Sequence, residues 1–137
     1  MSEGILDTSV VIALEQLDPR TLPDYSSISA VTLAELALGP LVAGDDRERM
    51  RRQLRLQEVE LSFDALPVDA RVARTFALVA ASLRARGKKP AARSFDALIA
   101  ATALAHRVPL FTLNPRDFDG IDDLDVRVPA RSATKAR

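Results

Sequence analysis

The sequence predicts an α/β fold with a short-stranded, mainly parallel sheet. Short apolar segments alternate along the chain with stretches whose hydrophobic residues recur every three or four positions, the patterns of strands and helices respectively. Chains that alternate in this way build a parallel sheet covered by helices. A length of 137 residues with 47% hydrophobic side chains suffices for one domain with its own core. We expect that domain to span residues 1–128, followed by a loose basic tail at 129–137.

The expected strands are short apolar or β-branched segments, at 4–6, 26–29, 65–68, 110–113 and 125–128. The expected helices lie between them, at 10–17, 30–38, 45 or 46 to about 59, 70–86 and 95–106. Their ends carry recognised stop and start signals: Asp18-Pro19, Gly39-Pro40 and Gly87 as stops, Asp69 and Ser94 as N-caps. Met50, Leu54 and Leu61 form the expected apolar face of the third helix, and the last helix is apolar almost all round.

Composition limits the chemistry that the chain can perform. There is no Cys and one His, His106, which excludes a disulfide framework, a thiolate metal site and a Cys nucleophile. A Ser-His-Asp triad and the usual zinc sites lose support for the same reason. The N-terminus lacks a signal-peptide pattern and no apolar run approaches ~20 residues, so we expect a cytoplasmic protein. Catalysis would then depend on carboxylates, hydroxyls, Arg, Lys or a metal held by oxygen ligands.

Four acids stand out by their positions: Asp7, Glu35, Asp96 and Asp117. Asp7 and Asp117 follow the carboxyl ends of expected strands, Asp96 begins the most apolar helix, and Glu35 lies within the apolar segment VTLAELALG. Each also has a plain structural explanation: a turn or helix cap for the Asp residues, a solvent-facing stripe for Glu35. Ligands bind at the carboxyl edge of such sheets. Because carboxylates that converge there need a cation, we expect Mg²⁺ or Mn²⁺.

Four motifs in this order resemble one family: LDTSV, the acid in LAELALG, FDALIAATAL and LFTLNPRDFDGI. They are similar to the PIN-domain ribonucleases, and within these to the VapC toxins of VapBC toxin–antitoxin systems. The resemblance implies a PIN-like three-layer α/β/α sandwich and an Mg²⁺- or Mn²⁺-dependent endoribonuclease. It also implies a homodimer and a cognate VapB-like antitoxin through which the toxin is bound to operator DNA.

The resemblance also implies roles for single residues. Asp7, Glu35 and Asp96 match the family's three core acids, and Asp117 matches the acid after the fourth strand, so all four are expected as catalytic and metal-binding residues. Asn114 stands where some members carry an acid, which leaves the fourth position open between Asn114 and Asp117. The side chains expected to orient the acids are Thr8, Ser9, Thr112 and Asn114. For Thr8 and Ser9, helix capping is an equal alternative.

An acidic site needs basic neighbours to hold an anionic substrate, and the balanced charge of 19 Lys+Arg against 19 Asp+Glu hides such neighbours. The expected RNA-binding residues precede the Asp96 helix: Arg84, Arg86, Lys88, Lys89 and Arg93. The arginines of residues 47–55 are interpreted as a solvated face. Four apolar residues in the 30–61 region are interpreted either as core or as the groove for an antitoxin helix: Leu33, Leu36, Met50 and Leu54.

Two other functions fit the fold class. A catalytically inactive PIN-like binding module would keep the fold without cleaving RNA. A phosphotransfer α/β domain of the haloacid-dehalogenase kind would need a second Asp two residues after Asp7, where the chain has Ser9. A response-regulator receiver would need an acid pair and a late Lys, and neither is evident.

Overall fold

The computed structural model describes residues 1–133 and contains a parallel sheet of five strands. The strands are β1 (Glu3–Leu6), β2 (Tyr25–Ser29), β3 (Ala65–Leu66), β4 (Leu110–Phe111) and β5 (Val126–Arg127). Their order across the sheet is β3-β2-β1-β4-β5, and every neighbouring pair is parallel. All five strands predicted from the sequence are therefore present, with β1 at the centre.

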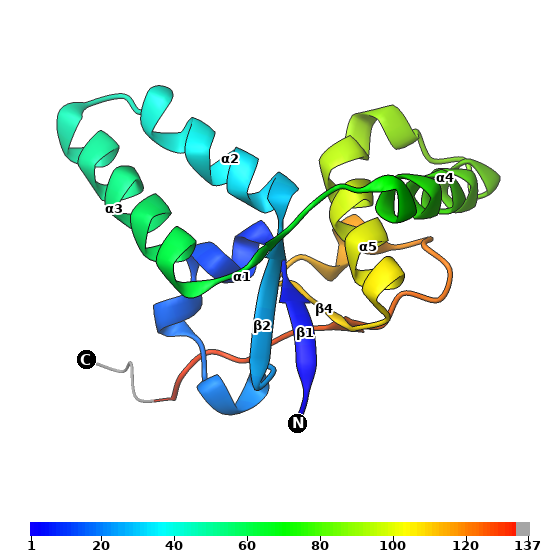
Figure 1. Ribbon diagram of the computed structural model, residues 1–137, viewed down its shortest axis with the longest axis horizontal. Helices are drawn as coiled ribbons and strands as arrows, with labels where there is room; N and C mark the ends of the chain where they lie inside the picture. The colour runs from blue at the N-terminus through cyan, green and yellow to red at the C-terminus, as the bar shows by residue number, and fades with distance from the viewer. Residues whose placement is uncertain (134–137) are drawn as a thin grey trace.

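Helices cover both faces of this sheet (Figure 1). The chain forms α1 (Thr8–Ile12), α2 (Ala30–Leu41), α3 (Asp46–Ser62), α4 (Ala70–Ala85) and α5 (Ser94–His106). Figure 1 shows α1, α2 and α3 on one side of the strands and α4 and α5 on the other, which confirms the three-layer α/β/α arrangement. Short 3₁₀ turns lie at 14–16, 19–21, 90–93 and 115–118. Among residues 1–133, no helix has the length and apolar character needed to cross a bilayer.

The alternation of side chains along β1 and β4 divides the core into two layers. Leu6 and Phe111 point to the side of α1 and α3, where they pack in one hydrophobic cluster. Their neighbours Ile5 and Leu110 point the other way and pack against Ile99 of α5. A third cluster joins α4 to the outer side of α5, so α5 is buried on several sides as its composition predicts.

Gly4 leaves room for the side-chain ring of Phe111, which lies over β1. A Cβ atom at this position would lie 2.5 Å from Cε1 of Phe111 and 3.1 Å from Cγ of Pro23. Any side chain here would displace the Phe111 ring from the core. The glycine therefore allows the Phe111 ring to pack against the backbone of β1.

The end of α2 differs from the prediction, because the helix continues through Gly39-Pro40 to Leu41. The last carbonyl groups of a helix lack partners within the helix. Here the Gly39 and Pro40 carbonyls accept long hydrogen bonds from the backbone N–H of Val42 and Ala43, at 3.3 and 3.4 Å, and α3 supplies further donors. Arg52 donates to the Gly39 carbonyl at 2.9 Å, and Arg49 donates to the Pro40 carbonyl at 3.1 Å. Two arginines of the segment interpreted as a solvated face therefore hold the α2–α3 corner together.

The other helix corrections are local. The first predicted helix is divided into α1 and the 3₁₀ turn at 14–16. Ser94 lies inside α5 and its hydroxyl donates to the Ala91 carbonyl at 3.0 Å, because the preceding 3₁₀ turn leads directly into the helix. Met50, Leu54 and Leu61 are exposed, and α3 instead buries Val59 against the sheet.

The segment after residue 128 begins in an ordered way. Asp18 donates its backbone N–H to the carbonyl of Ala130 at 2.8 Å, and Leu17 forms an antiparallel bridge with Arg131. The Arg131 guanidinium donates to Oε1 of Gln16 at 2.8 Å. Residues 134–137 of the expected tail lie outside the described residues.

Candidate active site

Asp7 follows β1 directly and is fixed by the first turn of α1. It is the N-cap of that helix, and its Oδ1 accepts hydrogen bonds from the backbone N–H of Val10 at 3.1 Å and the hydroxyl of Ser9 at 2.6 Å. The residue is only 6% exposed. Oδ1 accepts both of these hydrogen bonds, and the other carboxylate oxygen, Oδ2, has no hydrogen bond to residues 1–133. The capping and functional interpretations of Asp7 are therefore compatible.

Ser9 also connects the two central strands at this edge. Besides donating to Asp7, its hydroxyl accepts a hydrogen bond from the backbone N–H of Leu113 at 3.0 Å. Leu113 follows β4, whereas Ser9 follows β1. Ser9 thus holds the Asp7 carboxylate in a fixed relation to the segment that leads to Asp117.

Glu35 reaches the same edge from α2. The Thr8 hydroxyl donates to Oε1 of Glu35 at 2.6 Å, across 27 residues of sequence. The hydroxyl oxygens of Thr8 and Thr32 lie 3.1 Å apart, and Thr32 is fully buried. Sequence reasoning did not select Thr32 as a site residue. Its position one turn before Glu35 on the same helix face is the signal that would have found it.

Asp96 is the electrostatic centre of the site. Burial, followed by the negative charges of Asp117, Glu35 and Asp7, raises its pKa from 3.8 to about 6, although Arg93 opposes this. Asp96 lies in the first turn of α5, where the helix dipole alone would favour the charged form. Burial is the largest cause of the net upward shift in the Asp96 pKa, and the charges of Asp117, Glu35 and Asp7 add to it.

Asp117 is held at the rim of the site by Arg93. It lies in the 3₁₀ turn Pro115–Phe118, and the Arg93 guanidinium donates to its carbonyl oxygen at 3.1 Å. The same guanidinium nitrogen lies 3.9 Å from its Oδ1. Asn114 is exposed, and its backbone N–H donates to the buried Thr112 hydroxyl at 2.9 Å. Thr112 thus shapes the turn before Asp117, whereas Thr8 and Ser9 contact carboxylates directly.

The donor set fits a hard divalent cation better than a soft one, because every candidate ligand atom is a carboxylate oxygen. Within residues 1–133, no group of three or more Asp, Glu or His side chains is assembled closely enough to hold a metal ion. The four acids nevertheless lie near enough for the charges of Asp117, Glu35 and Asp7 to contribute to the raised pKa of Asp96.

The basic segment before α5 is mostly engaged within the protein. Arg86 forms an ion pair with Asp122 at 2.7 Å, and Lys88 donates to the Asp119 carbonyl at 3.1 Å. Arg93 binds Asp117 as described. The two other residues expected to bind RNA, Arg84 and Lys89, are exposed and form no side-chain hydrogen bond or ion pair with the described part of the chain.

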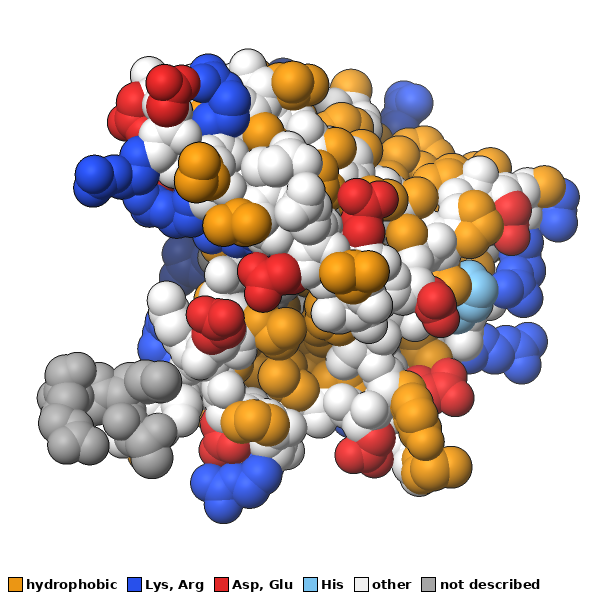
Figure 2. Space-filling view, turned by 60° about the vertical axis from the view of Figure 1, so that its left-hand side comes forward, with side chains coloured by type: hydrophobic (Ala, Val, Ile, Leu, Met, Phe, Trp, Pro, Cys, Tyr) orange, Lys and Arg blue, Asp and Glu red, His pale blue; other side chains and the backbone are white. Residues whose placement is uncertain are grey.

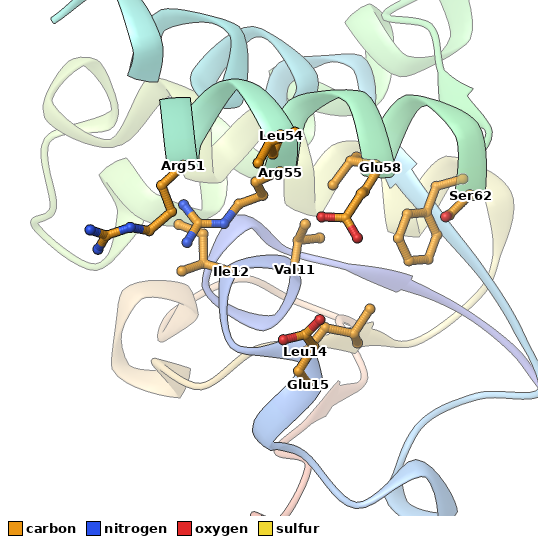
Figure 3. Close-up of a pocket in the computed structure, with 11 residues that line it drawn as sticks. Val11, Ile12, Leu14, Glu15, Arg51, Leu54, Arg55, Glu58 and Ser62 are labelled. Carbon is orange, nitrogen blue, oxygen red and sulfur yellow. The ribbon is translucent and has the colours of Figure 1, made fainter. Parts of the chain in front are cut away.

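A groove of about 420 Å³ lies between α1 and α3. Figure 3 shows Arg55 and Glu58 reaching from α3 toward Val11 and Ile12 of α1. Leu54, which is 54% exposed, also lines it. Other apolar residues are exposed nearby, and in Figure 2 hydrophobic side chains occupy the middle of the view while Lys and Arg lie mainly at its edges.

The structure separates the four apolar residues whose role the sequence left open. Leu36 is a core residue and Leu33 packs against the same cluster. Leu54 lines the groove between α1 and α3, and Met50 is 67% exposed beside it in a second hollow with Leu41 and Pro40. Of these four residues, Met50 and Leu54 are therefore the two whose side chains a partner could contact.

Comparison with known proteins identifies the family of the chain. The family model named PIN domain matches residues 5–124 of the chain. Ribonuclease VapC5 of Mycobacterium tuberculosis is 38% identical over 122 residues, which cover 87% of both chains. Ribonuclease VapC8 of the same species is 42% identical over 101 residues, covering 73% of this chain and 89% of the relative.

A solved structure shares the whole fold. The crystal structure of VapBC-5, a member of the VapBC family of toxin–antitoxin systems from Mycobacterium tuberculosis, superimposes with a TM-score of 0.79 at 35% identity. The match covers 96% of this chain and all of that one (100%). The chain therefore belongs to the PIN-domain family and, within it, to the VapC group.

Proposed function

We propose that this protein is a metal-dependent endoribonuclease that acts as the toxin of a toxin–antitoxin pair and restrains translation or growth by cleaving RNA. The observation that carries the proposal is the placement of the site's carboxylates: adjacent hydroxyls at the start of α1 bind Asp7 and Glu35, and burial together with the charges of Asp117, Glu35 and Asp7 raises the pKa of Asp96 to about 6. Such a concentration of negative charge destabilises the folded protein, and a bound cation would offset the repulsion. The relatives named as VapC ribonucleases support the nuclease assignment.

The proposed ligands are Asp7, Glu35 and Asp96, with Asp117 in a weaker or water-mediated position. The cation is Mg²⁺ or Mn²⁺, and when bound it supplies a water of lowered pKa and offsets the charge that develops on the phosphodiester. Ser9 and the Val10 N–H hold Oδ1 of Asp7, and Thr8 holds Oε1 of Glu35. In each case the second carboxylate oxygen is left for the cation.

The RNA backbone is expected to approach over exposed cations that the protein does not use internally. Arg84 and Lys89 meet this condition among the residues before α5. The attacking water makes a 5′-phosphate and a free 3′-hydroxyl the expected ends of the product. A 2′,3′-cyclic phosphate would instead indicate attack by the RNA's own 2′-hydroxyl and would contradict this mechanism.

The proposed partner is a VapB-like antitoxin, through which the toxin reaches operator DNA. VapBC-5, to which this chain is similar, is a toxin–antitoxin complex. The groove between α1 and α3 suits a peptide segment, because its apolar floor is bordered by Arg51 and Arg55 as well as by Glu15 and Glu58. A homodimer is proposed from the family resemblance.

The decisive experiment is cleavage of total cellular RNA by the purified protein with Mg²⁺ or Mn²⁺, read by end sequencing. Asp96→Asn removes one carboxylate without changing the size of the side chain, and we expect it to abolish cleavage while the protein stays folded. Induced expression should restrain growth with the native chain and not with Asp96→Asn. Full cleavage by the variant, or undiminished cleavage in EDTA, would contradict the proposal.

A further inference from the structure

Four side chains of residues 82–93 contact the segment 117–122. Arg86 pairs with Asp122, Lys88 donates to the Asp119 carbonyl, and Arg93 donates to the Asp117 carbonyl. The Ser82 hydroxyl, one turn earlier on α4, also donates to Asp122 at 3.1 Å. Each exposed contact contributes little alone, typically about 0–1 kcal/mol. Together they fix the 117–122 segment at three residues, Asp117, Asp119 and Asp122.

The loop backbone is adapted to these contacts. Gly120 has a φ of +86°, which disfavours other residues, and a Cβ there would lie 3.0 Å from Cδ of Arg86 and 3.5 Å from Cε of Lys88. The glycine therefore lets both basic side chains lie flat against the loop. Side chains packed in this way are poorly placed to reach RNA phosphates.

Arg93 is the member of this set that reaches the acids. Its guanidinium binds Asp117, and among the charges that influence Asp96 it is the one that opposes the raised pKa. It is also the N-cap residue of α5, three positions before Asp96. Arg93 thus connects the start of the Asp96 helix to the turn that carries Asp117.

We propose that Arg93 is a positioning residue that holds Asp117 beside the other three acids, and that Arg86, Lys88 and Arg93 fasten the 117–122 loop rather than forming the RNA-binding surface. This inference rests on the proposed metal site and goes beyond it by assigning a role to a residue that carries no ligand oxygen. It also leaves Arg84 and Lys89 as the exposed cations of that region.

Binding of Mn²⁺ distinguishes positioning from a simple effect of charge, because the two predict opposite signs. Removing a nearby positive charge, by itself, tightens cation binding. Losing the hold on Asp117 weakens it. Isothermal titration with MnCl₂ should give about 10-fold weaker binding for Arg93→Ala, at the lower end of the range seen when groups behind metal ligands are removed. Arg93→Lys should recover part of the loss.

A double-mutant cycle tests whether Arg93 acts through Asp117. In an Asp117→Asn background, Arg93→Ala should add less than about a 2-fold further loss of Mn²⁺ affinity, because the two residues act as one unit. The matched control is Arg74→Ala, which removes an exposed arginine from α4 that has no side-chain hydrogen bond or ion pair within residues 1–133. It should leave Mn²⁺ affinity unchanged.

Hydrogen–deuterium exchange provides a readout without metal or RNA. In EDTA, Arg93→Ala should speed exchange in peptides covering 115–119 and leave those from β1 and α2 unchanged. Tighter or unchanged Mn²⁺ binding, or unchanged exchange at 115–119, would overturn the inference. So would a variant whose only defect is a raised KM for RNA. If the native protein cleaves no RNA, the proposed function fails, whereas exchange and Mn²⁺ binding still decide the role of Arg93.

Discussion

At the scale of single residues, Asp7 and Glu35 each use one carboxylate oxygen for hydrogen bonds within the protein and leave the other oxygen for the proposed cation. One oxygen of Asp7 and one of Glu35 are bound by hydroxyls from the DTS sequence at the start of α1. Thr8 and Ser9 are adjacent in sequence but serve different acids on different elements. Helix capping and orientation of the acids, which the sequence left as alternatives for this segment, are combined in it, since Asp7 itself is the cap.

Thr8→Val tests the orientation of Glu35. Valine has nearly the same shape as threonine and lacks the hydroxyl, so Glu35 loses its only described hydrogen bond. We expect RNA cleavage to fall about 10- to 100-fold, as for other groups that orient metal ligands. Thr8→Ser keeps the hydroxyl and should restore most of the activity. Equal activity in the valine and serine variants would show that the hydroxyl is unimportant.

Asp96 should make the metal-free protein less stable as pH rises. Its folded pKa of about 6 lies above the ordinary 3.8, so the folded state binds the proton more tightly than the unfolded state. Stability from this group is complete below about pH 4 and is lost as pH rises through 6. A shift of this size would be worth about 3 kcal/mol in a fully buried site, and solvent screening reduces it to about 1 kcal/mol here.

Asp96→Asn removes this penalty. In EDTA at pH 7.5 the variant should therefore melt a few degrees higher than the native protein, by roughly 3–5 °C, and at pH 4 the two should melt at nearly the same temperature. Thermal melts across this pH range provide the measurement. A variant that melts lower at pH 7.5 would show that Asp96 is stabilised by contacts rather than strained by its neighbours.

At the scale of elements, sequence patterns located the strands and helices well but misplaced ends that depend on tertiary contacts. Gly39-Pro40 is a sound stop signal locally, yet α2 continues past it because arginines of α3 bind its last carbonyls. Likewise, Met50 and Leu61 look like core residues at helical spacing, but only the packed structure reveals which face of α3 meets the sheet. Side-chain partners far apart in sequence cannot be read from local periodicity.

The same limit applied to the candidate site. The acids were predictable because acids at strand ends and within apolar helices are conspicuous. Arg93 was selected as a cation, but its partner 24 residues away was not foreseeable from a charge run. Thr32 was missed although it lies one turn before Glu35 on the same helix face, because its contact with Thr8 joins residues 24 positions apart.

Arg52→Ala tests the α2–α3 corner. It removes the donor to the Gly39 carbonyl and should lower the free energy of unfolding by about 1–2 kcal/mol, measured by urea denaturation. Arg51→Ala is the matched control, because Arg51 and Arg52 both pair with Glu48 and only Arg52 also reaches that carbonyl. The control should lose no more than about 0.5 kcal/mol. Equal losses would assign the effect to Glu48.

At the scale of the whole molecule, the net charge of zero is the sum of acidic and basic groups that lie in different parts of the structure. The acids of the site gather at one edge of the sheet, and several arginines that appear free in the sequence are used to hold elements together. Arg49, Arg52, Arg86 and Arg93 all bind carbonyls or carboxylates within the chain. Contacts with partners therefore depend on a smaller set of surface groups than the sequence suggests.

Leu54 provides the test of the proposed antitoxin surface. It lines the groove between α1 and α3 and is more than half exposed, so a charged residue there should be tolerated by the fold. Leu54→Glu places a charge on the apolar floor, and a partner segment would have to desolvate it at a cost of several kcal/mol. We expect at least a 100-fold loss of affinity for the antitoxin, measured by titration calorimetry, with a melting temperature within 2–3 °C of the native value.

Leu78→Glu is the matched control, since Leu78 is 70% exposed on α4, on the other side of the sheet. It should bind the antitoxin normally; equal losses for both variants, or none for Leu54→Glu, would remove the groove from the interface.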